Sequence, residues 1–250
     1  MTMASTEKVF RVLEKLCQDG PCKASVISAE LGLNKSSVHR FLNVLADMGY
    51  VFQETETGFY TATLKVYEMG VQVKGRIGIA KIAAPVMRRL QVELNEAINL
   101  GVLYDFEMFT LERFTPDDKN TKIVVKARLP AYCTALGKIL LAHLDPAHLE
   151  RYLAATEFKA YTSRTMTDPD RIREMLEQIR HNGVAIDDRE LDDNIRSVAA
   201  PVRDDSGMVI AGISVTGSAP RLVGDHLEAV TNKLVAATGE ISSALGYRRK

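Results

Sequence analysis

The sequence lacks several features that would assign it to a class directly. Its 32 Lys and Arg residues are balanced by 32 Asp and Glu residues, so no overall field attracts the chain to nucleic acid or membrane. The longest apolar runs, such as 209–215, fall far short of the roughly 20 residues that span a bilayer. Three cysteines are too few, and odd in number, for a disulfide framework. Because the first residues also lack the basic flank and apolar core of a secretory signal, we expect a cytoplasmic protein.

The composition that remains is that of a folded protein, with 46% hydrophobic and 26% charged residues among 250. At about 100–200 residues per domain, this length fits two domains as well as one large domain. We place the boundary near Gly75, within a helical stretch over 64–95. The expected breaks in that stretch are Gly70, Gly75, Gly78 and Pro85. The sequence thus predicts one unit over 1–75 and a second over 76–250.

Residues 7–51 have the spacing of three helices. Apolar residues recur with helical period before Asp19-Gly20-Pro21, across the short segment 24–31, and again after the turn Gly32-Leu33-Asn34. Asn34 or Ser36 can cap the third helix. Strand-like pieces at 50–53 and 59–62 follow, joined by residues typical of a hairpin. Together these elements predict a winged helix-turn-helix.

The third helix begins with basic and hydroxyl residues. No acid lies between Glu30 and Asp47, so this segment is locally positive although the chain is neutral. With the apolar stripe facing inward, the residues left for DNA are Lys35, Ser36, Ser37, His39, Arg40 and Asn43. Ser and Lys at a helix start suit phosphate or base-edge contacts, and Arg40 can pair with a guanine edge. The alternative is a three-helix packing module with no DNA partner, because this spacing also arises by chance.

Strand and helix patterns alternate beyond the boundary. Strands are expected at 98–104, 106–114, 122–127, 184–189, 196–203 and 208–216, and helices at 134–143, 146–154, 168–182 and 224–245. A hairpin turn is expected at Asp204-Asp205-Ser206-Gly207. Groups of strands separated by helices predict an α+β domain around an antiparallel sheet.

Five separated segments resemble the IclR family of bacterial transcriptional regulators. Residues 24–42 (ASVISAELGLNKSSVHRFL) resemble its helix-turn-helix, and LPAYCTALGKILLA (129–142), GVAIDDRE (183–190), VAAPV (198–202) and ISVTG (213–217) resemble successive motifs of its C-terminal part. The resemblance covers about residues 7–247. It implies an N-terminal winged helix-turn-helix, a helical linker and a C-terminal GAF-like effector-binding domain with an antiparallel sheet flanked by helices. One departure is the hairpin, where Glu54 and Glu56 replace the usual arginine, so we expect no strong contact between wing and phosphate.

The resemblance also implies an effector site. Matched motif to motif, the residues that line it are Ala135, Leu136, Asp187, Ser197, Ser214 and Thr216. Free N–H groups at the start of the helix near Ala135 favour an anion, and Ser214 and Thr216 point to one face of a strand. Asp187 disfavours an anion beside it, so we expect a small, carboxylate-containing metabolite with a hydrogen-bond donor at its other end. The alternatives are interior hydroxyls bonded to backbone and an aspartate that caps a turn.

We therefore predict a homodimeric or homotetrameric transcriptional regulator, with repression favoured over activation. Its partners are double-stranded operator DNA and a small-molecule effector, and we expect no enzyme activity, cofactor, metal or membrane association. The apolar residues of helix 77–94 and of the first helix offer surfaces for pairing, and the alternative is that they belong to the cores within the chain. Sequence alone identifies neither the effector nor the operator.

A second class of function remains open, namely a small-molecule-binding protein or hydrolase with an N-terminal assembly module. Cys133, just before a helix start, is its candidate nucleophile. Neither His143 nor His148 stands in a recognised relation to this cysteine. Cys17 and Cys22 lack a second pair of ligands for zinc.

Overall fold

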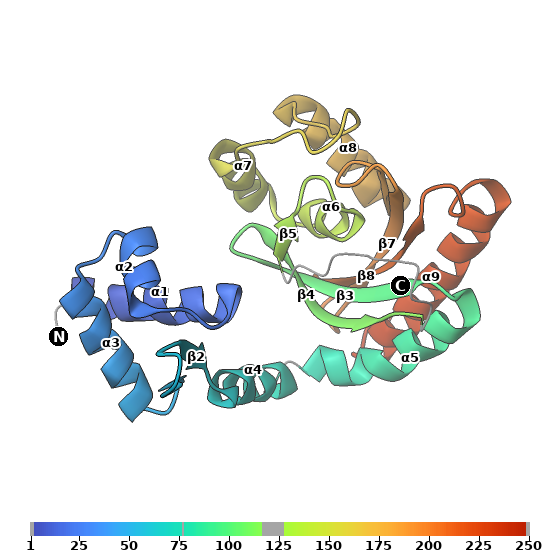
Figure 1. Cartoon of the computed structure of the whole chain (residues 1–250). Helices are drawn as coiled ribbons and strands as arrows, with labels where there is room; N and C mark the ends of the chain where they lie inside the picture. Colours follow the sequence, from blue (N-terminus) through green and yellow to red (C-terminus); the bar gives the residue numbers. More distant parts are fainter. Residues whose placement is uncertain (1–2, 77, 117–127, 249–250) are drawn as a thin grey trace. The chain divides into compact units, whose positions relative to one another are not determined.

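The computed structural model describes residues 3–76, 78–116 and 128–248. The chain divides into two compact units, Met1–Arg76 and Ile77–Lys250 (Figure 1). The strand expected at 122–127 lies outside the described residues. Within the described ranges, no helix is long and apolar enough to cross a membrane.

The first unit is a three-helix core with a hairpin and a further helix. Its elements are α1 (Met3–Asp19), α2 (Ala24–Leu31), α3 (Lys35–Asp47), β1 (Val51–Gln53), β2 (Tyr60–Ala62) and α4 (Leu64–Arg76). Gly32 ends α2 in the left-handed conformation, with φ of 63°, and the Asn34 side chain then caps α3 by accepting the Ser36 N–H. Val12, Ile27 and Leu42 are wholly buried where these helices meet. The predicted winged helix-turn-helix fold is confirmed.

The second unit is built around an antiparallel sheet that has six strands in the described part of the chain. Its helices are α5 (Gly78–Leu94), α6 (Ala135–Leu141), α7 (Pro146–Ala155), α8 (Pro169–Asn182) and α9 (Gly224–Ala244). Its strands are β3 (Ala97–Tyr104), β4 (Glu107–Phe114), β5 (Arg128–Pro130), β6 (Ala185–Asp188), β7 (Ile195–Arg203) and β8 (Val209–Ser218). The strands follow the spatial order β5-β4-β3-β8-β7-β6, and every recorded pair is antiparallel.

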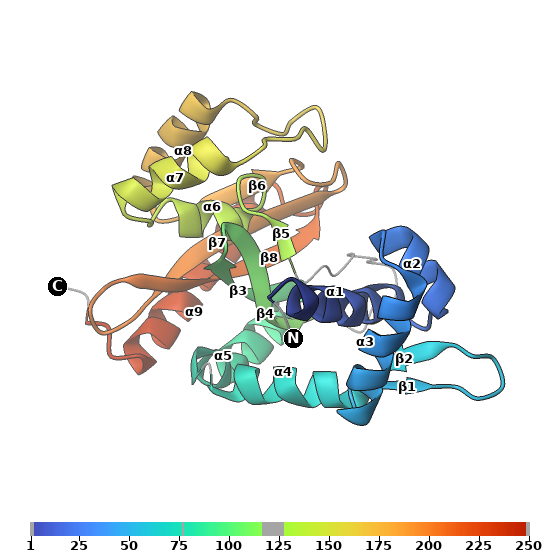
Figure 2. The ribbon, with the colours of Figure 1, turned by 90° about the vertical axis from the view of Figure 1, so that its left-hand side faces the viewer.

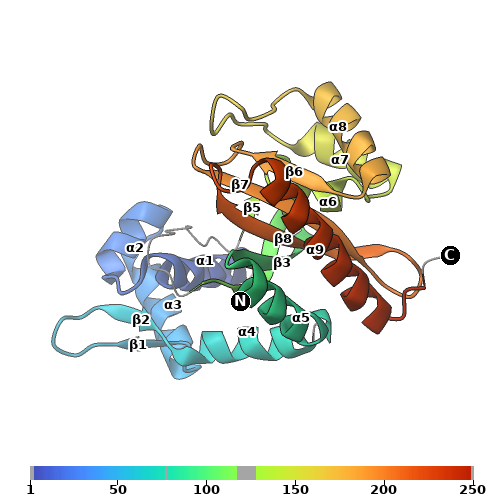
Figure 3. The same ribbon diagram turned by 90° about the vertical axis from the view of Figure 1, so that its right-hand side faces the viewer.

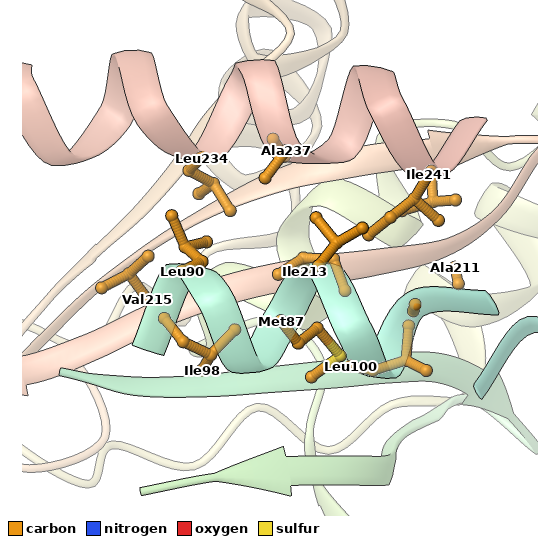
Figure 4. Close-up of a cluster of buried hydrophobic side chains, with 14 of the residues drawn as sticks. Met87, Leu90, Ile98, Leu100, Ala211, Ile213, Val215, Leu234, Ala237 and Ile241 are labelled. Carbon is orange, nitrogen blue, oxygen red and sulfur yellow. The ribbon is translucent and has the colours of Figure 1, made fainter. Parts of the chain in front are cut away.

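Helices cover both faces of this sheet. Helix α6 lies against β3, β6, β7 and β8 on one face, with α7 and α8 beyond it (Figure 2). Helices α5 and α9 pack on the opposite face and against each other (Figure 3). Figure 4 shows Met87, Leu90, Ile213 and Leu234 among the apolar side chains that meet between α5, α9 and the sheet. The predicted α+β fold is therefore confirmed, with a separate apolar cluster under α6.

In the linker region, three of the four predicted helix breaks are wrong. Gly70, Gly75 and Pro85 do not break helices, because α4 continues through both glycines and α5 continues through the proline. A proline inside a helix removes one backbone hydrogen bond and costs about 3 kcal/mol. The buried residues Ala83 and Met87 flank Pro85, and their burial against the sheet offsets that cost. Only Gly78 of the four expected breaks lies at a helix end.

Candidate functional sites

Helix α3 presents its predicted DNA face to solvent. Val38, Phe41, Leu42 and Leu45 are buried against α1 and α2. On the other side, Ser37 is half-buried and the remaining predicted contacts are exposed, namely Lys35, Ser36, His39, Arg40 and Asn43. The structure therefore places these six side chains along the first nine residues of α3, outside its buried stripe.

The basic side chains on this face of α3 are not neutralised by neighbouring acids of the fold. Among the described residues, neither Lys35 nor Arg40 makes an ion pair, and the Arg40 guanidinium lies 5.5 Å from the centroid of the Phe41 ring. The Ser36 hydroxyl donates to Asn34 Oδ1 at 3.0 Å, so part of its hydrogen-bonding capacity serves the cap. The charges of Lys35 and Arg40 are therefore available for phosphate or base edges.

The hairpin tip is acidic, as its sequence requires. Glu54 and Glu56 are exposed, and the Thr57 hydroxyl donates to the Glu54 carboxylate. The structure places one base beside the hairpin that sequence reasoning missed, because the Lys23 ammonium lies 5.3 Å from the centroid of the Phe59 ring. Lys23 comes from the loop before α2, and only the β-hairpin geometry reveals its proximity.

The second unit contains a cavity of about 400 Å³ between the sheet and the start of α6. All six residues expected to contact an effector line it: Ala135, Leu136, Asp187, Ser197, Ser214 and Thr216. Three of them form one row across adjacent strands, because Asp187 of β6 pairs with Ser197 of β7, which pairs with Thr216 of β8. Directly paired residues point to the same face of a sheet, so these side chains converge from three strands.

Asn99 of β3 completes the polar surface. Its amide Nδ2 donates to Ser214 Oγ at 3.1 Å and to Thr216 Oγ1 at 3.2 Å. The two hydroxyls therefore accept from a side chain, and their own O–H groups remain available to donate to a ligand. Sequence reasoning missed Asn99, although a polar residue between the apolar Ile98 and Leu100 was a usable signal for the opposite strand face.

The start of α6 forms the opposite wall of the cavity. Thr134 caps the helix, its hydroxyl oxygen accepting the Gly137 N–H at 3.1 Å. Gly137 allows a close approach, because a Cβ at this position would lie 2.1 Å from the Ala131 carbonyl oxygen. The backbone of α6 therefore lies close to Ala131 at this point, and Ala135 and Leu136 line the cavity.

Asp187 lies in a buried cluster of charged groups beneath the cavity. Its Oδ1 accepts the Glu190 N–H at 2.8 Å, while Lys138 pairs with the Glu190 carboxylate and donates to the Ile186 carbonyl oxygen at 3.0 Å. Burial raises the pKa of Asp187 to about 7, and the nearby Lys138 ammonium only partly opposes that rise. Asp187 is thus both a turn cap and a cavity residue.

The cysteine environment opposes the nucleophile hypothesis. Cys133 is fully buried, and its thiol faces the Pro130 carbonyl oxygen at 3.9 Å. Burial, together with the Asp187 and Glu190 carboxylates, raises the pKa of this thiol to about 12, whereas a nucleophile needs a lowered pKa. Among the described residues, no three His, Cys, Asp or Glu side chains cluster as metal ligands would.

Comparison with known proteins finds matches to both units. Residues 49–243 match the family model for the bacterial transcriptional regulator IclR C-terminal, and residues 5–55 match the IclR helix-turn-helix domain. The chain is 31% identical over 250 residues to the HTH-type transcriptional regulator KdgR of Escherichia coli (strain K12), covering 98% of this chain and 94% of the relative. It is 29% identical over 252 residues to the DNA-binding transcriptional repressor YiaJ of the same organism, covering 98% and 89%. The crystal structure of an IclR homolog from Microbacterium hydrocarbonoxydans, complexed with 4-hydroxybenzoate, has a TM-score of 0.85 at 26% identity and covers 98% of this chain and 99% of that one.

Proposed function

The chain belongs to the IclR family of bacterial transcriptional regulators, and from that premise we propose that it represses its target genes and releases them in response to a small carboxylate-containing metabolite. Residues 1–75 bind the operator and residues 76–250 bind the effector. YiaJ, a relative of similar length, is named a repressor, which supports this sign of regulation.

One observation carries the effector proposal. Six residues from four separate segments, between positions 135 and 216, line a single cavity of about 400 Å³. A cavity of this size, with apolar walls and a few convergent polar groups, is typical of a small-molecule site. The related protein that is complexed with 4-hydroxybenzoate holds a ligand with a carboxylate at one end and a hydroxyl at the other. A metabolite of that polarity fits the polar surface described above.

We propose assembly as a homodimer or homotetramer through an exposed apolar surface of α4. Leu16, Val86 and Leu90 are buried within the chain, so the apolar stripes of α1 and α5 are used by the intrachain cores. Helix α4 instead exposes 76% of Leu64 and 70% of Tyr67. These two residues lie three positions apart and hence on one side of the helix, where they offer an apolar surface for a second copy.

The proposal is tested by a gel-shift titration of the full-length protein on the DNA upstream of its own gene. A scrambled duplex of the same length and composition is the control. We expect binding to the upstream fragment at least 1,000-fold tighter than to the scrambled duplex, because specific and non-specific affinities of regulators typically differ by about 10³–10⁷. Equal affinity for the two duplexes would contradict a regulatory role and favour an N-terminal unit that only mediates assembly.

A further inference from the structure

Arg113 of β4 lies on the cavity wall, and its side-chain Nε has no hydrogen-bond partner among the described residues. It is directly paired with Asn99 of β3, which is paired with Ser214 of β8, so the three side chains share one face of the sheet. Arg113 is half-buried and lines the cavity. Its Nε is shielded from solvent and has no hydrogen-bond partner in the described part of the chain, where its guanidinium also makes no ion pair.

This arrangement is energetically unusual. A guanidinium stays protonated at physiological pH, and burying a charge without pairing it costs free energy. Burial lowers the pKa of Arg113, and no carboxylate among the described residues counteracts that effect. An anionic ligand in the cavity would therefore supply the counter-charge and the hydrogen-bond acceptor that this guanidinium lacks among the described residues.

The polar surface has a cation at one end and an acidic side chain at the other. Arg113 is on β4, whereas Asp187 is on β6, and the intervening strands contribute Asn99, Ser214 and Thr216 on the same face. Neighbouring strands lie about 4.8 Å apart, so Arg113 and Asp187 stand four strand spacings from each other. A ligand whose anionic group is at β4 keeps that group away from Asp187.

We propose that Arg113 binds the carboxylate of the effector through two parallel N–H···O hydrogen bonds from Nε and Nη. The effector is a hydroxylated carboxylic acid, with its hydroxyl-bearing part along Asn99 and Ser214 toward Asp187. This inference rests on the proposed effector-binding function and places the anion at β4 rather than at the start of α6. That helix has only seven residues, and its one basic side chain, Lys138, already pairs with Glu190.

The test compares Arg113→Gln and Arg113→Lys with the wild-type full-length protein by isothermal titration calorimetry. The probes are 4-hydroxybenzoate, its neutral analogue 4-hydroxybenzamide, and gluconate as an aliphatic hydroxy acid. The control variant is Arg88→Gln. Arg88 is exposed on α5 and stacks on Phe114, which follows Arg113 in β4 and points to the other face of the sheet.

We expect the wild type and the control to bind at least one carboxylate tenfold or more tightly than 4-hydroxybenzamide. Arg113→Gln should lose that preference, and Arg113→Lys should keep part of it.

A second measurement needs no ligand. If Arg113 serves binding rather than folding, the thermal midpoint of ligand-free Arg113→Gln should equal or exceed that of the wild type, because the substitution removes a half-buried guanidinium whose Nε has no partner among the described residues. The proposal is overturned if Arg113→Gln keeps the carboxylate preference, if the wild type shows none for any probe, or if ligand-free Arg113→Gln unfolds several degrees below the wild type. Operator binding is measured separately on the same samples. A wild type that prefers carboxylates but binds no operator would contradict the proposed function and leave the role of Arg113 intact.

Discussion

At the residue scale, we expect single charges on α3 to determine the affinity for DNA. Arg40 and Lys35 are exposed and make no ion pair among the described residues, so we expect the fold to tolerate their removal. We expect Arg40→Ala to weaken operator binding by about 1–3 kcal/mol if the guanidinium reads a base edge. Lys35→Ala should weaken all sequences similarly and lower the salt slope by about one.

Fluorescence anisotropy at several salt concentrations distinguishes these two effects. The matched control is Lys159→Ala, since Lys159 is exposed in the second unit. A double variant of Lys35 and Arg40 that binds the operator like the wild type would show that α3 is not the recognition helix.

The buried charge of Asp187 has a consequence for stability. Its pKa is about 7 in the folded protein because of burial, against about 3.9 for an unfolded aspartate. Between these values the folded state binds more protons than the unfolded state, so the free energy of unfolding falls as pH rises from about 4 to 7. Asp187→Asn keeps an acceptor for the Glu190 N–H and removes the charge. We expect the variant to match the wild type near pH 4 and to be more stable at pH 8, by on the order of 2 kcal/mol.

The neighbouring Asp188 provides a control of opposite sign. Burial raises its pKa, but hydrogen bonds from Arg189 and Arg196 outweigh that effect and leave the pKa lowered. Its contribution to stability is therefore present above the unfolded pKa and is lost as pH falls through the folded pKa. Urea titrations at pH 4 to 8 should show Asp188→Asn less stable than the wild type at pH 8. A pH-independent difference between Asp187→Asn and the wild type would contradict the assignment of a buried charge.

At the scale of elements, the start of α6 depends on a glycine. A Cβ at Gly137 would lie 2.1 Å from the Ala131 carbonyl oxygen, and backbone cannot yield as a flexible side chain can. We expect Gly137→Ala to destabilise the protein by about 2 kcal/mol or more. The control is Gly239, exposed in α9, where a Cβ would meet no described atom within 4 Å. Gly239→Ala should stabilise the protein by about 0.5–1 kcal/mol. Urea midpoints measure both; a neutral Gly137→Ala would mean that the close approach of α6 is not required.

Most helices and strands lie where local sequence patterns predict them. The predictions fail where tertiary contacts determine the structure. Helix α2 and the Asp204–Gly207 turn were predictable because periodicity, Gly32 and turn chemistry are local signals. Helix α5 persists through Pro85 because its packing on the sheet outweighs local propensity. Strand β5 (Arg128–Pro130) has only three residues and exists through its pairing with β4, so no periodic pattern reveals it.

The residues of the candidate site likewise divide into those that a local pattern predicts and those that only the tertiary structure reveals. The hydroxyls of Ser214 and Thr216 were assigned to one face by strand alternation and by motif resemblance. Asn99 and Arg113 were missed because their importance depends on strand order, which places β3 and β4 beside β8. The register between strands that are far apart in sequence is set by tertiary packing, so no local sequence pattern predicts it.

At the scale of the whole molecule, we expect assembly as an oligomer to bring two copies of α3 to the operator. One helix reads only a few base pairs, so useful specificity needs two copies on a palindromic operator. We expect light scattering to give at least a dimer at micromolar concentration. The double substitution Leu64→Glu and Tyr67→Glu should give a monomer with unchanged circular dichroism. Met208→Glu, at another exposed apolar residue, is the control and should keep the wild-type mass. A monomeric wild type, with and without DNA, would refute the assembly.

The most direct test of the account is operator affinity measured with and without an effector that binds the wild-type cavity. Anisotropy of the labelled upstream fragment is recorded for the wild type, Asp187→Ala and Ser214→Ala. We predict that the three proteins bind the operator alike without effector, because the substitutions lie outside the DNA-binding unit. The effector should weaken binding by the wild type at least tenfold. Both variants should require about tenfold or more effector for the same response, since each leaves a polar group unpaired at a cost of about 1–3 kcal/mol. An unchanged effector response in both variants would show that the effector acts elsewhere and would contradict the account.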